Sequence, residues 1–206
     1  PTQVQLGRSW TQQTGDPLEA MLSTPSPGGK SLPVKSVSDL PAMQFEAIAT
    51  ARGYTTDQLG LILPTSLCSG QIARMTADYF NRKGLGKEQG LAGFVALAHT
   101  EGCGAASGSG EALYVQTMLG YLTHPAVKHC LLLEHGCEKT HNDHMRQEIA
   151  DLGIDSDTLG WASIQLDGGI EKVTQKMETW FNDAFAQTTP PTVSYTHLTL
   201  PTIVRV

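Results

Sequence analysis

From residue 59 onward, short runs of apolar residues alternate with longer amphipathic segments. The runs are apolar at every position rather than at alternate ones, which indicates strands buried on both faces. Strands are expected at residues 59–63, 94–98, 130–133 and 162–166, and helices at 69–82, 111–122, 140–152 and 169–185. Strand–helix units joined by right-handed crossovers predict an α/β fold: a Rossmann-like parallel sheet of about four strands with helices on both faces.

Two of these helices carry more detailed expectations. In the first, Ile72, Met75, Tyr79 and Phe80 have the spacing of one helix face, which we expect to pack on the sheet. Asp167 precedes the last helix, and its carboxylate can accept hydrogen bonds from backbone amides two or three residues further on. We therefore expect Asp167 to cap that helix.

The two ends of the chain differ from this regular middle. Residues 1–58 predict an extended segment rich in Pro, Gly and Ser, with a short helix over residues 42–52, while residues 59–186 form the α/β domain and 187–206 a tail. The string from residue 193 to 206 resembles the translated read-through of a sequencing adapter, with an edge strand over 195–200 as the alternative. We expect both ends to be incomplete, with a further half of the protein following Thr192.

Composition excludes several classes of protein. The net charge of −6 provides no basic surface for nucleic acid, and no apolar run reaches the roughly 20 residues that span a membrane. The first residues lack the pattern of a signal peptide, so a cytoplasmic protein is expected. The chain has four cysteines, and with 40% hydrophobic residues it needs no disulfides to hold a core. We interpret the cysteines as reduced thiols, with a disulfide as the alternative.

Polar side chains gather on the segments that follow the expected strands. These segments are residues 65–68, which end at Cys68, residues 99–104, and residues 134–138, which end at Cys137 and Glu138; Gln165 follows the fourth strand. Ligands of open parallel sheets bind outside the carboxyl ends of the strands, so these segments predict one site at one sheet edge. Cys68 also falls at a helix start, where the thiolate form is favoured.

A glycine-rich loop, Gly102 to Gly110, leads into the second helix. Its backbone amides and the positive end of the helix could cradle an anion. The loop lacks the spacing of the dinucleotide fingerprint, so the carboxylate of a small substrate fits better than a cofactor pyrophosphate. Nucleotide binding remains the alternative for this loop.

Several of these motifs together resemble one enzyme family. The stretches Leu63-Pro-Thr-Ser-Leu-Cys68, His99-Thr-Glu-Gly-Cys-Gly104, Leu119-Gly-Tyr-Leu-Thr-His-Pro125 and Leu131-Leu-Leu-Glu-His-Gly-Cys-Glu138 resemble the altronate/galactarate dehydratase family, over roughly residues 59–185. The resemblance implies a carbon–oxygen lyase that removes water from a small sugar acid to give a 2-keto-3-deoxy acid. It also implies a divalent metal, Fe²⁺ or Mn²⁺.

This chemistry suggests roles for the residues on the strand ends. His99 is the candidate acid/base, because imidazole titrates near neutrality, and Glu101 and His135 are further catalytic candidates. Candidate metal ligands are Cys68, Cys103, Cys137 and Glu138. Candidate substrate-binding residues are Thr65, Ser66, Gly102, Gly104, Ser107 and Gln165.

Two alternatives remain open. Thiolates on three loops could hold an iron–sulfur cluster in place of a single metal ion. From another class, the chain could be a non-catalytic module that binds a small anion or senses oxidation through its thiols. The expected partners are a small sugar acid and the missing C-terminal half, and a homo-oligomer is compatible with the sequence.

Overall fold

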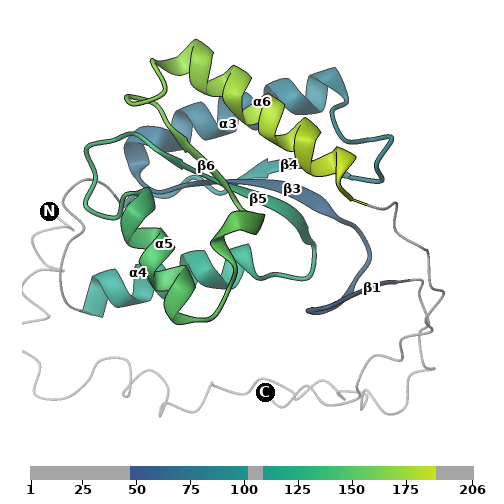
Figure 1. The fold of residues 1–206 in the computed structure, drawn as a ribbon, viewed down its shortest axis with the longest axis horizontal. Helices are drawn as coiled ribbons and strands as arrows, with labels where there is room; N and C mark the ends of the chain where they lie inside the picture. Colours follow the sequence, from purple (N-terminus) through teal and green to yellow (C-terminus); the bar gives the residue numbers. More distant parts are fainter. Residues whose placement is uncertain (1–46, 102–108, 189–206) are drawn as a thin grey trace, which may run out of the picture. The chain divides into compact units, whose positions relative to one another are not determined.

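The centre of the structure is a four-stranded sheet in which all strands run parallel, with the order β4–β3–β5–β6 (Figure 1). The computed structural model describes residues 47–101 and 109–188, all within one compact unit of the chain. The strands are β3 (Leu59–Pro64), β4 (Gly93–Ala96), β5 (Val127–Glu134) and β6 (Gly160–Ser163). The predicted α/β class and parallel sheet are confirmed.

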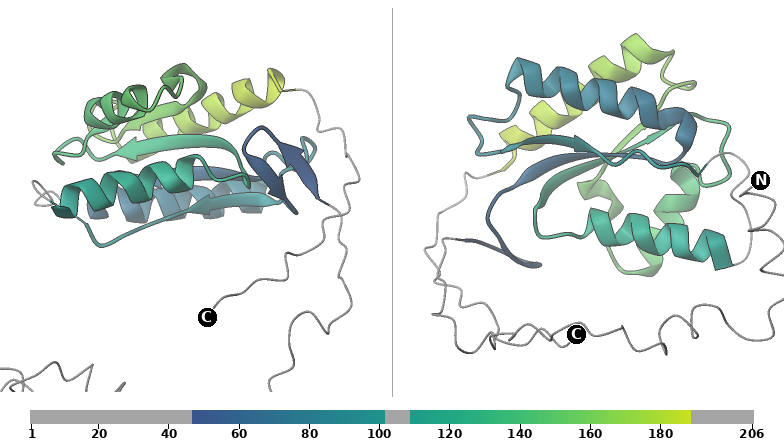
Figure 2. Two further views of the ribbon diagram at one scale, coloured as in Figure 1. Left: turned by 90° about the horizontal axis from the view of Figure 1, so that it is seen from below. Right: turned by 180° about the vertical axis from the view of Figure 1, so that it is seen from behind.

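Helices cover both faces of this sheet. Helices α3 (Leu67–Lys83) and α6 (Ile170–Ala186) lie on one face, and α4 (Ser109–Leu122) and α5 (Asn142–Asp151) on the other, as Figures 1 and 2 show. A 3₁₀ turn, η2 (Ser156–Thr158), precedes β6. Within the described ranges, no helix is both long and apolar enough to cross a bilayer.

The apolar runs of the strands supply two separate cores. In β3, Ile62 packs with α3 and α6, whereas its neighbours Leu61 and Leu63 pack with α4 and α5. Because successive side chains of a strand point to opposite faces, a central strand between two helical layers must be apolar at every position. This explains why the strands were recognisable from the sequence as continuous runs.

The face that α3 turns to the sheet differs from the predicted one. Ala73, Ala77 and Phe80 are buried, but Met75 is 53% exposed and Tyr79 is 37% exposed. The small alanines let the helix backbone approach the sheet closely, so the larger apolar side chains lie on its outer side. The prediction was wrong for Met75 and Tyr79, because apolar spacing alone does not show which stripe faces the sheet.

A small hairpin precedes the sheet where the end of a helix was expected. Strands β1 (Ile48–Thr50) and β2 (Gly53–Thr55) pair antiparallel, and Thr50 Oγ1 donates to Gly53 O at 2.9 Å. Gly53 has a φ of +133°, which favours glycine at this turn. The helix predicted over residues 42–52 is therefore wrong from residue 48 onward, and residues 42–46 lie outside the described ranges.

The edge strand β4 is capped by a side chain from α3. Asn81 Nδ2 donates to Phe94 O at 2.8 Å, and Phe94 N donates to Asn81 Oδ1 at 2.7 Å. The carboxamide thus pairs with the edge as a neighbouring backbone would. Exposed edge groups invite pairing with other chains, and this contact protects one position of the edge.

The predicted cap on α6 is absent. The helix begins after Gly169 without a side-chain cap, and the Asp167 carboxylate accepts instead from Ser163 N at 2.8 Å. Lys176 Nζ also donates to Asp167, at 2.8 and 2.9 Å. The prediction for Asp167 was wrong, because the turn after β6 folds back and directs the carboxylate to that turn and to the side of α6.

Candidate functional site

The segments after β3 and β4 are joined at the carboxyl edge of the sheet. His99 Nε2 lies 2.9 Å from Pro64 O, and Leu67 N donates to Glu101 O at 2.5 Å. These contacts hold His99 and Glu101 beside the start of α3. The segment after β4, which carries both of these predicted catalytic residues, is therefore fastened to the end of the neighbouring strand β3.

The loop after β5 is tied to the same place through Glu138, whose side chain is 4% exposed. Its Oε1 accepts hydrogen bonds from Thr65 Oγ1 at 2.8 Å, Ser66 Oγ at 3.0 Å and His135 N at 2.8 Å. Its Oε2 accepts from the backbone amides of Gly136 at 2.7 Å and Cys137 at 2.9 Å. One carboxylate thus organises its own loop and fastens it to the end of β3.

The acidity of Glu138 reflects this environment. Burial acts to raise the pKa of its carboxyl group, but the backbone amides and the Thr65 hydroxyl stabilise the charged form more strongly. The net result is a pKa lowered to about 2. The carboxylate is therefore ionised throughout the neutral range.

The hydroxyls predicted to bind substrate are part of this arrangement. Thr65 and Ser66 are each 1% exposed. Ser66 is also the N-cap of α3, where it forms a reciprocal capping box with Ser69. Both side chains are therefore placed to position the loops, and their predicted contact with substrate stays a prediction.

Tyr114 was not singled out from the sequence, yet it joins α4 to this edge. Its hydroxyl donates to Thr65 O at 2.9 Å, and Thr140 Oγ1 donates to the same oxygen at 3.1 Å. Burial raises the pKa of Tyr114 far above its ordinary value, so the phenol remains a donor. Within its helix pattern Tyr114 was indistinguishable from an ordinary core aromatic residue.

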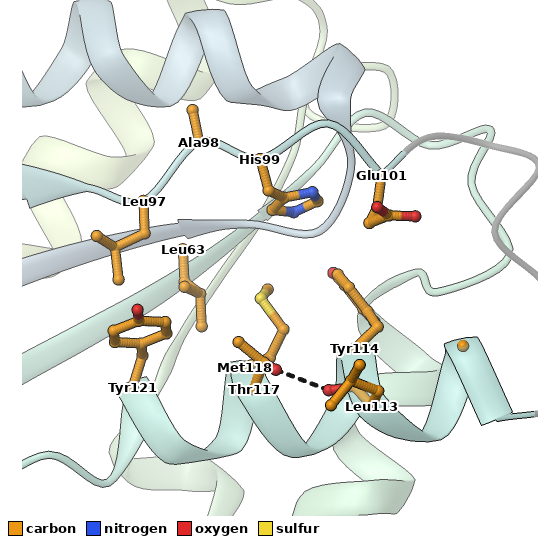
Figure 3. Close-up of a pocket in the computed structure, with 11 residues that line it drawn as sticks. Leu63, Leu97, Ala98, His99, Glu101, Leu113, Tyr114, Thr117, Met118 and Tyr121 are labelled. Carbon is orange, nitrogen blue, oxygen red and sulfur yellow. Dashed lines mark hydrogen bonds between the residues drawn. The ribbon is translucent and has the colours of Figure 1, made fainter. Parts of the chain in front are cut away.

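A cavity of about 410 Å³ lies between α4 and the segment after β4 (Figure 3). Its wall is mostly apolar, and its polar side chains include His99, Glu101 and Tyr114. In Figure 3, His99 and Glu101 extend from the segment after β4 toward Tyr114, which rises from α4. An apolar cavity with a few convergent polar groups is the usual form of a small-molecule site.

The contact of His99 with Pro64 fixes which ring nitrogen donates. A carbonyl oxygen can only accept, so Nε2 carries a hydrogen and donates it to Pro64 O. Nδ1 is buried and has no hydrogen-bond partner among the described residues. In the neutral form of an imidazole oriented in this way, Nδ1 is the nitrogen that can accept a proton.

A possible metal position lies on the loop after β5. Donor atoms of His135, Cys137 and Glu138 all lie within 4.8 Å of one another, and His135 Nδ1 is 3.2 Å from Cys137 Sγ. Imidazole and thiol suit a borderline metal such as Fe²⁺. Glu138 would have to give up hydrogen bonds to bind a metal. His135 and Cys137 are therefore the better metal ligands of this group, and Glu138 is the residue that orients them.

The remaining predicted residues are placed as follows. Cys68 is exposed in the first turn of α3. Gln165 is also exposed; its backbone amide donates to His135 O at 3.1 Å, and its side chain packs against Gly136. Four of the predicted site residues lie outside the described ranges, namely Gly102, Cys103, Gly104 and Ser107.

The fold and this edge define a three-layer α/β domain with a cavity at its strand ends that is mostly apolar and carries a few convergent polar side chains. A family profile described as "D-galactarate dehydratase/Altronate hydrolase, second domain" matches residues 58–188. The chain therefore belongs to the D-galactarate dehydratase/altronate hydrolase family, as its second domain. A search of curated proteins and a search of solved structures each found no match.

Proposed function

We propose that this domain takes part in the metal-dependent dehydration of a sugar acid to a 2-keto-3-deoxy acid, with His99 as the base. The observation that carries the proposal is the imidazole of His99, which lines the cavity beside Glu101, is held by the hydrogen bond from Nε2 to Pro64 O, and leaves Nδ1 without a hydrogen-bond partner among the described residues. Family membership supports the reaction class, and the cavity of about 410 Å³ is large enough for a sugar acid.

The proposed step begins when His99 Nδ1 takes the proton from the carbon next to the substrate carboxylate. The electron pair of that C–H bond forms the new carbon–carbon double bond, and the neighbouring hydroxyl leaves. Glu101, which is solvent-exposed, relays a proton from water to that hydroxyl, so that it departs as water. The resulting enol then takes up a proton on the carbon that lost the hydroxyl and releases the proton of its remaining enol hydroxyl, which gives the keto acid.

His135 and Cys137 are the residues proposed to hold the metal, and Cys68 is a further candidate. The metal would supply Lewis acidity that stabilises negative charge on the substrate. Glu138 keeps the loop of His135 and Cys137 in position through its hydrogen bonds to three backbone amides. Its role in the proposal is positioning rather than contact with substrate.

The test compares the full chain with its His99→Gln variant, incubated with D-galactarate or D-altronate and Fe²⁺ or Mn²⁺. The readouts are formation of the keto acid and, in unreacted substrate, uptake of deuterium from D₂O at the carbon next to the carboxylate. Removing a general base should lower both by about 10²-fold or more. His124→Gln, at an exposed turn, is the matched control and should retain the wild-type rates.

Two results would reject the proposal. One is turnover that His99→Gln leaves unchanged, and the other is a wild-type chain that neither turns over nor exchanges deuterium with either metal. The metal assignment is tested separately by measuring bound iron in Cys137→Ser. A Cys137→Ser variant that binds as much iron as the wild type would remove Cys137 from the ligand set.

A further inference from the structure

A separate cavity of about 340 Å³ lies at the opposite edge of the sheet from His99, where strands β3 and β5 begin. Its walls come from the β1–β2 hairpin, the residue before β3, the start of β5 and Thr188. Figure 2 shows this hairpin beside the amino ends of the strands. The cavity shares no lining residue with the His99 cavity, so the proposed dehydration does not account for it.

The charges on the wall of this cavity are all positive. Arg52 and Lys128 line it, and no Asp or Glu is among its described lining residues. The chain as a whole has 20 acidic residues against 14 basic ones, so this wall has the opposite charge balance to the chain. A cavity lined by one sign of charge attracts ligands of the other sign. The wall therefore favours an anion.

Lys128 is partly buried without a counter-charge. Its Nζ donates to Gln89 O at 2.9 Å, and no ion pair joins it to a carboxylate of the described residues. Burial lowers the pKa of its ammonium group below the ordinary value. Removing a cation from water is costly unless it is paired, so an anion at this position would stabilise the charged form.

Arg52 is anchored by the end of helix α4. Its Nη1 donates to Leu122 O at 2.9 Å, which is the one hydrogen bond of its side chain within the described ranges. The negative end of the helix dipole offsets only part of the charge on the guanidinium. Its remaining N–H groups can bind a ligand, and a guanidinium presents them in a planar fork that pairs with two oxygens at once.

The number of donors favours a phosphate over a carboxylate. The fork of one arginine can occupy both oxygens of a carboxylate, whereas a phosphate monoester has three terminal oxygens and about two negative charges. A phosphate bound to the Arg52 fork therefore keeps a third oxygen for Lys128 Nζ. The wall also includes the apolar side chains of Ile48, Pro125 and Val127, which suit the organic part of a monoester.

From this juxtaposition we propose that the cavity at the amino ends of β3 and β5 binds a small organic phosphate monoester, with its phosphate group on Arg52 and Lys128. The inference does not rest on the proposed function, because it uses none of the residues assigned to the dehydration. A bound phosphate would link the turn of the hairpin, which carries Arg52, to β5, which carries Lys128. Occupancy should therefore stabilise the chain against unfolding.

The test measures the binding of propyl phosphate to the full chain by isothermal titration calorimetry, and the unfolding temperature by circular dichroism. Three probes are compared at the same ionic strength. Butyrate keeps the propyl group but replaces the phosphate with a carboxylate, 1-propanol lacks the charge, and D-galactarate is the substrate of the proposed reaction. Propyl phosphate should bind at least about tenfold more tightly than each of the three and should raise the unfolding temperature most.

Variants locate the contacts. Lys128→Met and Arg52→Gln each remove one positive charge from the wall, and each should weaken propyl phosphate binding by about tenfold or more. Lys172→Met and Arg74→Gln are the matched controls, because they remove the same charges at exposed positions of α6 and α3. They should bind as the wild type does. His99→Gln should also leave this binding unchanged, since its cavity is separate.

Lys128→Arg provides a second test at the same position, because it keeps the positive charge. It should retain most of the affinity, and a variant that binds as weakly as Lys128→Met would count against the inference. The inference is also overturned by no binding of propyl phosphate, by equal affinity for butyrate, or by equal losses in the test and control variants. Binding of propyl phosphate by a chain that forms no keto acid would count against the proposed function alone.

Discussion

The hydroxyl of Thr65 donates to the carboxylate of Glu138 at 2.8 Å, and both residues are almost fully buried. This contact joins residues 73 positions apart and fixes the loop after β5 against the end of β3. His135 and Cys137 lie on this loop after β5. His99 is hydrogen-bonded to the carbonyl oxygen of Pro64, the residue before Thr65. The geometry of the site therefore depends on a residue that need not touch substrate.

Replacing Glu138 with Gln tests this dependence. The Gln side chain retains one acceptor oxygen but turns an amino group toward donors, so at least two of the hydrogen bonds are lost. Leaving buried donors unsatisfied should lower the free energy of unfolding by roughly 2–4 kcal/mol. Urea unfolding followed by circular dichroism measures the change, and the exposed Glu88→Gln is the control, expected to stay within about 0.5 kcal/mol of wild type.

Acid stability gives an independent test of the same carboxylate. The pKa of Glu138 is about 2 in the folded chain against an ordinary 4.5, so the unfolded chain binds more protons between these pH values. The stabilisation is fully present above pH 4.5 and is lost as the pH falls toward 2, amounting to up to about 3 kcal/mol. Unfolding free energies of wild type and Glu138→Gln should converge over this range. A constant difference between them would contradict the assignment.

The capped edge of the sheet predicts a separate effect. Asn81→Ala removes both hydrogen bonds to Phe94 and exposes its backbone groups at the edge of β4. We expect a loss of about 1–3 kcal/mol and faster aggregation at high concentration, measured by urea unfolding and light scattering. Asn182→Ala is the matched control, because its side-chain amide donates to Glu178 O on the same helix and to nothing else among the described residues. Equal aggregation of the two variants would argue against the capping role.

Two glycines should respond to alanine in opposite directions. A Cβ at Gly60 in β3 would lie 2.5 Å from Phe94 Cε1, inside the aromatic core, so Gly60→Ala should cost about 1–3 kcal/mol. At Gly120 in α4 a Cβ would meet nothing within 4 Å, so Gly120→Ala should stabilise the chain by about 0.5–1 kcal/mol. Thermal unfolding of both variants measures the contrast. A stabilising Gly60→Ala would mean that the core is looser than described.

The class of fold could be predicted because β3 and residues 130–133 of β5 are continuously apolar. These stretches are buried between the two helical layers, so the pattern is local and visible. The strand ends also predicted a candidate site, since parallel strands bring their following loops to one edge. His99 and Glu101 after β4, and His135 and Cys137 after β5, were proposed in this way, and their roles stay a prediction.

The positions that the sequence misassigned depend on neighbours distant along the chain. Met75 and Tyr79 fit an apolar helix face, but the close approach of α3 to the sheet selects the stripe of Ala73 and Ala77. Asp167 had the position of a helix cap, but the turn after β6 directs it to Ser163 and Lys176. The local sequence spacing is compatible with both the predicted and the observed placements of these side chains, so only the packing of the folded chain distinguishes the two.

For this chain, the sequence by itself determined the order of strands and helices, the edge at which polar residues meet, and the family. Only the tertiary structure decided that the buried carboxylate of Glu138 accepts hydrogen bonds from five donors, and that Nδ1 of His99 is buried without a partner among the described residues. The physical reason is that hydrophobic periodicity is a property of short segments. The number and direction of hydrogen-bond donors around a side chain are set by segments that meet only when the chain has folded.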